Sequence, residues 1–233
     1  MNNSGNLATF DLETTGVDVE TSRIVSACIA VVDASGTVVS RWDWLADPGV
    51  DIPAGASAIH GITTERARAE GRAAAVVVAE IAEKLTETCA LGIPLVVYNA
   101  PYDLSLLDRE CRRYSVDGFR EPYVVIDPLV IDKAVDRYRR GKRTLEVTSG
   151  FYGVALDDAH DAGSDAIAAA RVAQALLAKF ADKLGTSYSE LHDRQRTWYA
   201  DQAASFQDYI RSSKGDQSFV ANDEWPVRAV PPQ

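Results

Sequence analysis

The sequence predicts an α/β fold: a mixed five-stranded sheet, in which an antiparallel three-strand meander precedes parallel strands, with helices on its flanks. The first observation is a series of three apolar segments at residues 7–10, 24–32 and 37–45. The second is the turn signal Asp33-Ala34-Ser35-Gly36, which joins the last two segments as a hairpin. The third is that helical periodicity begins only after these segments and then alternates with short buried strands.

The elements after the meander follow from changes in hydrophobic period. Prolines and glycines between residues 48 and 55 indicate an irregular connection. A helix is expected after Thr63, because apolar residues recur there at helical spacing, namely Ala74, Val77, Val78, Ile81 and Leu85. Residues 95–98 and 123–126 are predicted as short strands. Further helices are expected from 99 onward and over 129–138, 144–152, 161–183 and 188–211.

The chain of 233 residues is long enough for one substantial domain and an appendage. Gly185 marks the predicted boundary between a domain at 1–184 and a C-terminal extension at 185–233. The extension is expected to hold a mostly polar helix and a tail without much regular structure, because Gly, Asp, Asn and three prolines dominate its end. His192, on that helix, has no motif around it and is expected to be a solvated residue.

Composition restricts the class of protein. The net charge of −10 argues against a protein that coats nucleic acid non-specifically, but it does not exclude a nuclease. No apolar run approaches the roughly 20 residues of a membrane span, and the N-terminus lacks the form of a signal peptide, so we expect a cytoplasmic protein that does not contact the membrane. The cysteines, Cys28, Cys89 and Cys111, support neither a disulfide framework nor a zinc site.

Two carboxylates follow the first predicted strand. Side chains alternate faces along a strand, so Asp11 and Glu13 project from one face while Phe10 and Leu12 enter the core on the other. Like charges this close disfavour double ionisation unless a cation lies between them. Hard divalent ions such as Mg²⁺ take oxygen ligands, so the pair predicts a metal site.

Three further groups converge on that strand end. Ligands of open α/β sheets bind at the carboxyl ends of parallel strands. Asp103 lies in the first turn of the helix that follows the strand at 95–98, where Pro101 suits a first-turn position. Asp165 lies near the start of the helix at 161–183, and His160 immediately precedes that helix. Asp127, before Pro128, is expected to be a turn residue rather than a ligand.

These residues form three motifs in a fixed order: Phe10-Asp11-Leu12-Glu13-Thr14-Thr15-Gly16, then Asn99-Ala100-Pro101-Tyr102-Asp103, then an H-x-A-x-x-D pattern from His160 to Asp165. In these motifs the chain resembles the DEDDh (DnaQ-like) exonucleases. That family includes the proofreading subunit of bacterial replicative DNA polymerase, ribonuclease T and oligoribonuclease. The resemblance covers roughly residues 7–180 and implies a ribonuclease-H-like fold, in agreement with the predicted order of elements.

The resemblance also implies a catalytic site with two divalent ions, Mg²⁺ or Mn²⁺. Asp11 would bridge both ions, Glu13 and Asp165 would complete the first, and Asp103 would support the second. His160 would be the general base that takes a proton from the attacking water. An imidazole titrates near pH 6.5, which suits that task.

Contacts with the substrate are implied for several further residues. Main-chain groups of Leu12, Thr14 and Thr15 would meet the 3′-terminal nucleotide. His60 lies in a His-Gly-Ile segment that in the family is near the substrate pocket; a structural role at the start of a helix is equally compatible. Asn99 would either orient the site or cap a helix. The loop at 137–143 contains five basic residues and one tyrosine, which suits phosphate contact or a solvated surface.

The resulting prediction is a metal-dependent 3′→5′ exonuclease that acts on DNA 3′ ends, releases nucleoside 5′-monophosphates in proofreading or repair, and has a DNA polymerase subunit as a candidate partner. An exoribonuclease that trims RNA is the first alternative. A non-catalytic module that binds polymerase or nucleic acid is the second, although it has no need of all five catalytic positions. The sequence leaves the oligomeric state open.

Overall fold

The computed structural model describes residues 5–119, 123–156 and 160–231, and within these ranges the strands form one six-stranded sheet in the order β4-β3-β2-β1-β5-β6. The predicted antiparallel meander is confirmed as β1 (Leu7–Thr14), β2 (Ile24–Val32) and β3 (Val38–Asp47). Parallel to β1 follow the short strands β5 (Leu95–Val96) and β6 (Val125–Ile126). The sixth strand, β4 (Arg72–Ala73), pairs with the outer edge of β3 and was not expected from the sequence.

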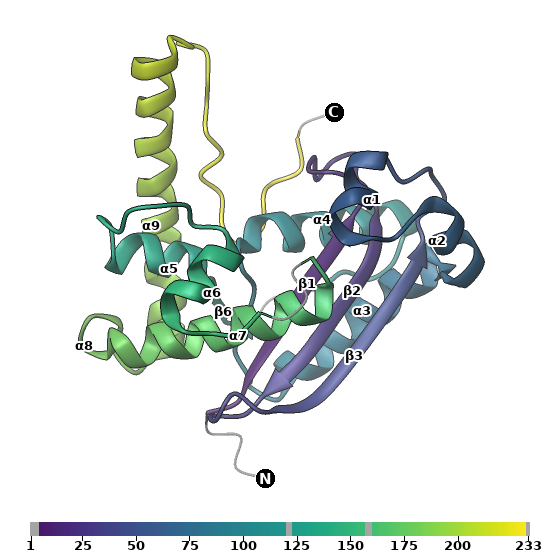
Figure 1. Cartoon of the computed structure of the whole chain (residues 1–233), viewed down its shortest axis with the longest axis horizontal. Coiled ribbons are helices and arrows are strands. Elements are labelled where there is room, and N and C mark those ends of the chain that lie inside the picture. Colours follow the sequence, from purple (N-terminus) through teal and green to yellow (C-terminus); the bar gives the residue numbers. More distant parts are fainter. Residues whose placement is uncertain (1–4, 120–122, 157–159, 232–233) are drawn as a thin grey trace.

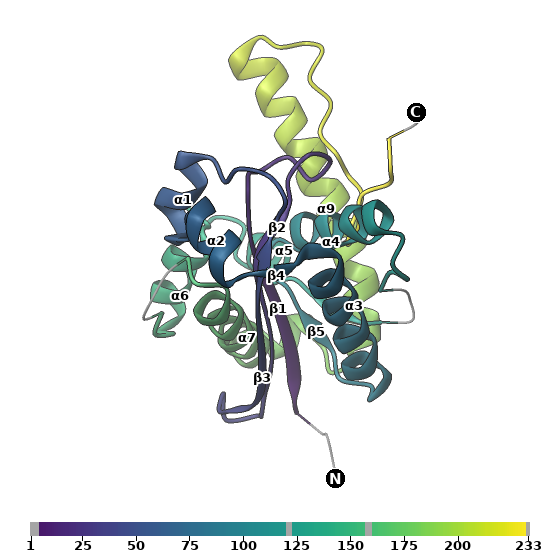
Figure 2. The same cartoon turned by 90° about the vertical axis from the view of Figure 1, so that its right-hand side faces the viewer.

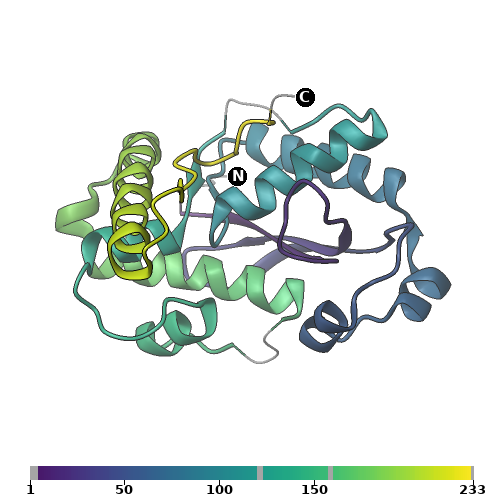
Figure 3. The same ribbon diagram turned by 90° about the horizontal axis from the view of Figure 1, so that it is seen from above.

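Helices cover both faces of the sheet (Figure 1). One face carries α3 (Ala74–Ala90) and α4 (Ala100–Tyr114), and the other carries α6 (Leu145–Tyr152) and α7 (Ala162–Lys179). The three layers separate clearly when the molecule is turned (Figure 2) or seen from above (Figure 3). The α/β prediction is therefore confirmed.

The alternation along β1 distributes its side chains between the two layers. Phe10 and Leu12 lie in the core beneath α3 and α4, while Leu7 lies in the core beneath α7. Thr9 faces α7 too, and its hydroxyl donates to the carbonyl of Ala166 on that helix (2.7 Å). The period of two thus decides that the odd-numbered residues of β1, Asp11 and Glu13 included, face α7.

The segment between β3 and α3 is more helical than the sequence indicated. It forms α1 (Ala54–His60) and α2 (Thr64–Glu70), and the chain leaves α2 at Gly71 instead of continuing into one helix. A Cβ at Gly71 would lie 2.3 Å from the carbonyl oxygen of Ala67 and 2.6 Å from the backbone of Ala46. Only glycine allows this close approach to β3, where the chain then forms β4.

The later helices begin close to the predicted residues, and several end earlier. They are α5 (Pro128–Val135), α8 (Ala181–Leu184), which continues α7 after a break, and α9 (Tyr188–Tyr209), which ends in the π-helical turn η1 (Ile210–Lys214). No helix in the described ranges has both the length and the apolarity that a membrane span requires. Cys28, Cys89 and Cys111 are free thiols.

Side chains of α9 complete the hydrogen bonding of the sheet edge at β6. The Val125 amide donates to Nδ1 of His192 (3.0 Å), and the Asp127 amide donates to Oε1 of Gln195 (2.7 Å). Gln195 in turn donates from Nε2 to the carbonyl of Val125 (3.0 Å). The expectation that His192 is solvated was wrong: its side chain is buried, because an edge strand needs partners for its backbone groups.

Up to residue 231, where the description of the tail ends, the chain after α9 forms no helix or strand beyond η1, as expected, yet side chains hold it against α4. The Arg228 amide donates to the hydroxyl of Ser105 (2.8 Å), and Arg109 donates to the carbonyls of Arg228 (3.0 Å) and Ala229 (2.7 Å). Trp225 is buried in the core beneath α3 and α4. The division into a domain at 1–184 and an extension stays a prediction; the two parts share these contacts.

We expect Gln195→Ala to lower the free energy of unfolding by roughly 2–4 kcal/mol, because it leaves the Asp127 amide and the Val125 carbonyl buried without partners. Denaturant unfolding measures the change. Thr197→Ala, an exposed position on the same helix, is the matched control and should stay within about 0.5 kcal/mol of the wild type. Equal stabilities of the two variants would contradict the role assigned to Gln195.

Candidate active site

Three elements, β1 itself and two helices, supply the acids at the end of β1. Asp11 and Glu13 stand opposite Cys28 and Ser26 in the register of β1 and β2, and both are half-buried. Asp103 lies in the first turn of α4, and Asp165 lies in the first turn of α7. The first turns of the two helices, which lie on opposite faces of the sheet, thus meet the same strand.

Asp103 is fixed directly to β1. Its side chain is buried, and Oδ1 accepts a hydrogen bond from the amide of Leu12 (3.1 Å). Pro101 occupies the first turn of α4, as predicted. Asn99 precedes the helix in a left-handed conformation (φ 66°), and its side chain does not cap it, so the capping role considered for Asn99 is not observed.

Glu13, His160 and Asp165 come together most closely. One ligand atom from each lies within 4.8 Å of the others, a spacing that suits a shared metal ion. Oδ2 of Asp165 accepts from the amide of His160 (3.2 Å), and His160 has a left-handed backbone (φ 68°). Oδ1 of Asp165 is buried and has no hydrogen-bond partner within the described residues. A buried carboxylate oxygen without a partner, next to a second carboxylate and an imidazole, fits a divalent cation.

The pKa values of the four carboxyl groups also favour a bound cation. Burial raises the pKa of Asp11 well above its ordinary value, and the charges of Asp103, Asp165 and Glu13 raise it further. Burial and the charges of Asp165 and Asp161 raise the pKa of Glu13 to about 8. Burial likewise raises the pKa values of Asp103 and Asp165. A cation would relieve this repulsion and allow all four carboxylates to ionise, so the residues present fit metal binding.

The residues after Glu13 form a rigid turn. The Thr14 hydroxyl donates to the carbonyl of Gly16 (2.7 Å) and lies against the hydroxyl of Tyr102, and Thr15 Oγ1 accepts from the amide of Arg23 (2.9 Å). The amide of Leu12 is already bonded to Asp103. Both hydroxyls and this amide therefore have partners within the protein. Nucleotide contact by the main chain of Leu12, Thr14 and Thr15 stays a prediction.

A cavity of about 370 Å³ adjoins the acids and extends from Glu13 and His160 to His60 and Trp44. His60 ends α1, and its Nδ1 accepts from the amide of Ile62 (3.1 Å). Burial lowers the pKa of His60, and the nearby His160 lowers it further. The structure therefore places His60 beside the site, and its contact with substrate stays a prediction.

Arg41 of β3 supports the start of α7 and was missed by the sequence analysis. Its guanidinium group is paired with Asp43 (2.7 Å) and lies 4.0 Å from Asp161, the N-cap of α7. A Cβ at Gly163 would lie 2.1 Å from Nη2 of Arg41, so the guanidinium group occupies the space beside this glycine. The glycine between His160 and Asp165 was the available signal.

Asp127 has a wider role than that of a turn residue. It is the N-cap of α5, where its carboxylate accepts from the amide of Leu129. The same carboxylate accepts from the amides of Asn99 (3.0 Å) and Ala100 (2.9 Å), and from the indole of Trp225 (3.3 Å). It thereby fixes the start of α4, three residues before Asp103. No local motif indicates this role, because three of its donors are distant in sequence.

A family model described as "Exonuclease" matches residues 9–173, a segment that contains all five predicted catalytic positions. The chain belongs to this exonuclease family, in agreement with its resemblance to the DEDDh exonucleases. This exonuclease chain is 29% identical over 164 residues to a DNA polymerase III of PolC type from Streptococcus thermophilus, covering 70% of the chain and 10% of that protein. It is 29% identical over 195 residues to a DNA polymerase III subunit epsilon-like protein from Rhodobacter capsulatus, covering 80% of the chain and 26% of that protein.

Among solved structures, the fold is similar to that of Escherichia coli exonuclease I in complex with a dA16 oligonucleotide. The TM-score is 0.63 at 21% identity, and the match covers 75% of this chain and 41% of that one. The chain thus spans about a tenth to a quarter of the curated relatives named above. The ribonuclease-H-like fold implied by the sequence resemblance is confirmed.

Without metal, Glu13 should make the folded protein less stable as the pH rises. Its pKa is raised from 4.5 to about 8, so between these values the folded chain keeps a proton that the unfolded chain loses. Thermal unfolding with a chelator, at about pH 5 and about pH 8, should show a smaller pH-dependent loss for Glu13→Gln than for the wild type. Magnesium should stabilise the wild type more at the higher pH. Identical pH dependence of the two proteins would refute the assignment.

Loss of the Asp127 carboxylate should destabilise the protein in a graded way. Asp127→Ala leaves several buried amides without an acceptor and should cost roughly 3 kcal/mol or more of unfolding free energy, whereas Asp127→Asn keeps one oxygen and should cost less. Asp193→Ala, at an exposed position of α9, is the control. Denaturant unfolding should show the largest loss of unfolding free energy for Asp127→Ala, a smaller loss for Asp127→Asn and the smallest for Asp193→Ala. A different order would count against the role of Asp127.

Proposed function

We propose that this chain is a metal-dependent 3′→5′ exonuclease that removes nucleoside 5′-monophosphates from single-stranded or frayed 3′ ends of DNA. The observation that carries the proposal is the close grouping of Glu13, His160 and Asp165, whose ligand atoms lie within 4.8 Å of one another. Asp11 lies on the same strand face as Glu13, and burial and the charges of Asp103, Asp165 and Glu13 all raise its pKa. A module that only binds nucleic acid has no need to crowd four carboxylates, which repel one another.

Two divalent ions, Mg²⁺ or Mn²⁺, complete the proposed site. Asp11 would be shared between them, Glu13 and Asp165 would hold one, and Asp103 would support the other. Bound ions of this kind neutralise the charge of a phosphodiester and lower the pKa of water. Oδ1 of Asp165, which has no hydrogen-bond partner among the residues that the structure describes, supports this assignment.

The protein itself supplies the proton transfer and the alignment. His160 acts as the general base toward the attacking water, since a ring nitrogen of an imidazole can accept a proton. The hydrogen bond from its amide to Asp165 fixes the backbone of His160 next to a ligand carboxylate. The bond between Asp103 and the Leu12 amide holds α4 against the strand that carries Asp11 and Glu13.

The preference for DNA draws support from the relatives, which include a DNA polymerase III, an epsilon-like subunit and an exonuclease I solved with a DNA oligonucleotide. Association with a DNA polymerase, in proofreading or repair, is part of the same proposal. Trimming of RNA is the alternative within the family. Matched DNA and RNA oligonucleotides, with single-stranded, paired and mismatched 3′ ends and with or without magnesium, test the choice; faster hydrolysis of RNA would overturn the DNA assignment.

We expect Asp11→Ala to abolish hydrolysis while the circular dichroism spectrum and the unfolding curve keep their native form. His160→Ala should lower turnover by roughly 10²- to 10⁴-fold and leave metal binding in place, because it removes the base and not the carboxylates. Oligonucleotide degradation and metal titration calorimetry measure the two effects. Undiminished activity of Asp11→Ala would exclude the proposed site.

A further inference from the structure

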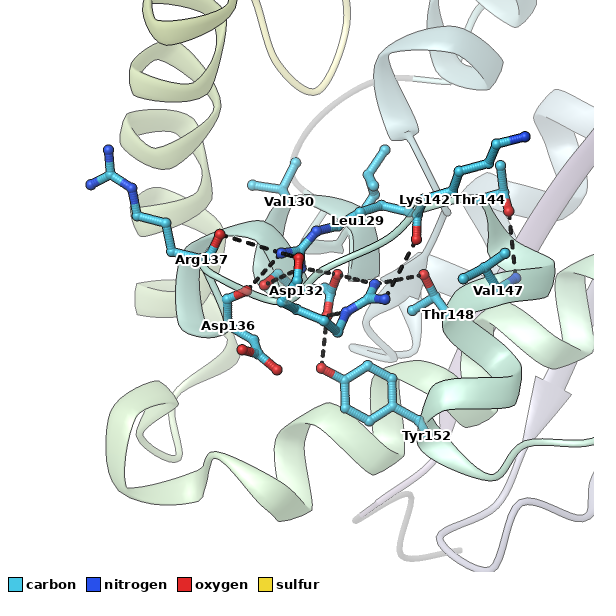
Figure 4. Close-up of polar contacts among 12 residues, drawn as sticks. Leu129, Val130, Asp132, Asp136, Arg137, Lys142, Thr144, Val147, Thr148 and Tyr152 are labelled. Carbon is cyan, nitrogen blue, oxygen red and sulfur yellow. Dashed lines mark hydrogen bonds and ion pairs between the residues drawn. The ribbon is translucent and has the colours of Figure 1, made fainter.

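In the basic loop after α5, residues 137–143, some side chains point into the protein and others point outward. Asp132, fully buried, accepts from Nη2 of Arg139 (2.7 Å), from Nη1 of Arg143 and from the hydroxyl of Tyr152 (2.7 Å). The Arg139 and Arg143 side chains are only 3% and 13% exposed. Figure 4 shows this network around Asp132 and Tyr152. These two arginines hold the loop in place, so the sequence-based expectation of phosphate contact does not apply to them.

Arg137 is turned the other way. Its side chain extends from the network toward α9, whereas Lys142 of the same loop points away from that helix (Figure 4). Lys133 lies four residues before Arg137, and both residues line a pocket between α5 and α9. Within the described part of the chain, neither the Lys133 nor the Arg137 side chain forms a hydrogen bond or an ion pair. The Lys133 and Arg137 side chains are therefore available to bind an anion.

A pocket of about 460 Å³ lies between these cations and α9; we call it the α5–α9 pocket. Its opposite wall is formed by α9, through Trp198, Asp201, Gln202, Ser205 and Phe206. The side chain of Phe206 is 52% exposed and meets Phe219 of the tail edge to face (5.6 Å between centroids). One face of Trp198 carries the guanidinium group of Arg194 at 4.6 Å. Aromatic surface therefore faces the two cations.

The chemistry of the pocket suits a nucleotide better than a simple anion. Desolvation by the surrounding residues lowers the pKa of Lys133, so a bound anion would favour its charged form. The aromatic rings offer stacking surface, which nucleobases use irrespective of sequence. Asp201 would repel a purely anionic peptide, but it accepts hydrogen bonds from the exocyclic amines of bases. A strand of nucleic acid carries phosphate, ring face and exocyclic amine side by side.

We propose that the α5–α9 pocket is an accessory binding site for single-stranded nucleic acid. Lys133 and Arg137 bind backbone phosphate, and the exposed ring of Phe206 stacks a base of the same strand, on the 5′ side of the nucleotide in the active site. The inference rests on the proposed exonuclease function. It also accounts for local basic character in a chain with a net charge of −10.

The test compares two double variants that each remove two positive charges. Lys133→Ala with Arg137→Ala leaves Arg143, which is paired with Asp132, as the remaining cation among the described residues that line the pocket. Arg140→Ala with Lys142→Ala removes two exposed loop charges that do not line it. Fluorescence anisotropy with 5′-labelled oligodeoxyadenylates of graded length, whose bases carry an exocyclic amine, measures binding in the presence of a chelator. We expect the pocket variant to bind long strands roughly 10-fold more weakly and to lose about 0.7 of salt slope per phosphate contact. Dinucleotide binding should not change.

The contribution of base stacking is tested with a second variant and its matched control. Phe206→Ala should weaken binding of long strands roughly 5-fold or more. Tyr209→Ala removes a similarly exposed ring (51%) that does not line the pocket, and it should have little effect. Unchanged unfolding curves for all variants show that the fold is retained.

Three outcomes would overturn the site. The pocket and control variants could lose equal affinity for long strands, the pocket variant could lose equal affinity for dinucleotides and long strands, or it could lose no affinity at all. Binding of an acidic peptide that the pocket variant abolishes, with oligonucleotide binding intact, would instead assign the pocket to a protein partner and overturn the proposal. Because anisotropy needs no turnover, it distinguishes failure of the pocket from failure of the exonuclease assignment, which the hydrolysis assays report separately.

Discussion

Mutual repulsion among the carboxylates at the end of β1 is the constraint around which the structure is built. Asp11, Glu13, Asp103 and Asp165 lie close enough to raise one another's pKa, and burial adds to the effect. Such a cluster persists only when rigid elements hold its members in place. Each carboxylate accordingly stands on a strand or in the first turn of a helix, and Asp103 is bonded to the strand itself.

The support for this cluster extends to the C-terminal part of the chain. Asp127 ties the start of α4 to α5 and to Trp225, while Gln195 bonds the amide of Asp127 and the edge of β6. The alignment of Asp103 therefore depends on residues more than 90 positions away. The tail after α9, although irregular, is a packed component of the scaffold, and its contacts with Arg109 fasten it to the helix that carries Asp103.

The basic groups serve two different purposes. Arg139 and Arg143 neutralise a buried carboxylate and shape their loop, which makes them part of the interior. Arg137 and Lys133 remain available on the surface that faces α9. An acidic protein can thus present local positive potential without a basic overall balance, and the distribution of charge decides where an anionic polymer can bind. The proposed active site and the α5–α9 pocket would then contact different parts of one strand.

The sequence by itself determined those features that depend on neighbours along the chain. The period of two placed Asp11 and Glu13 opposite Phe10 and Leu12. The position of Asp103 followed from the strand that precedes its helix, and the position of Asp165 followed from the start of the helix predicted at 161–183. Only the tertiary structure decided the burial of His192, the break at Gly71 and the inward turn of Arg139 and Arg143. Each of these depends on a specific partner brought close by folding: an edge strand, the backbone of β3 or a buried aspartate. Periodicity describes which face of an element is apolar, but it does not identify the group that a polar side chain will meet there.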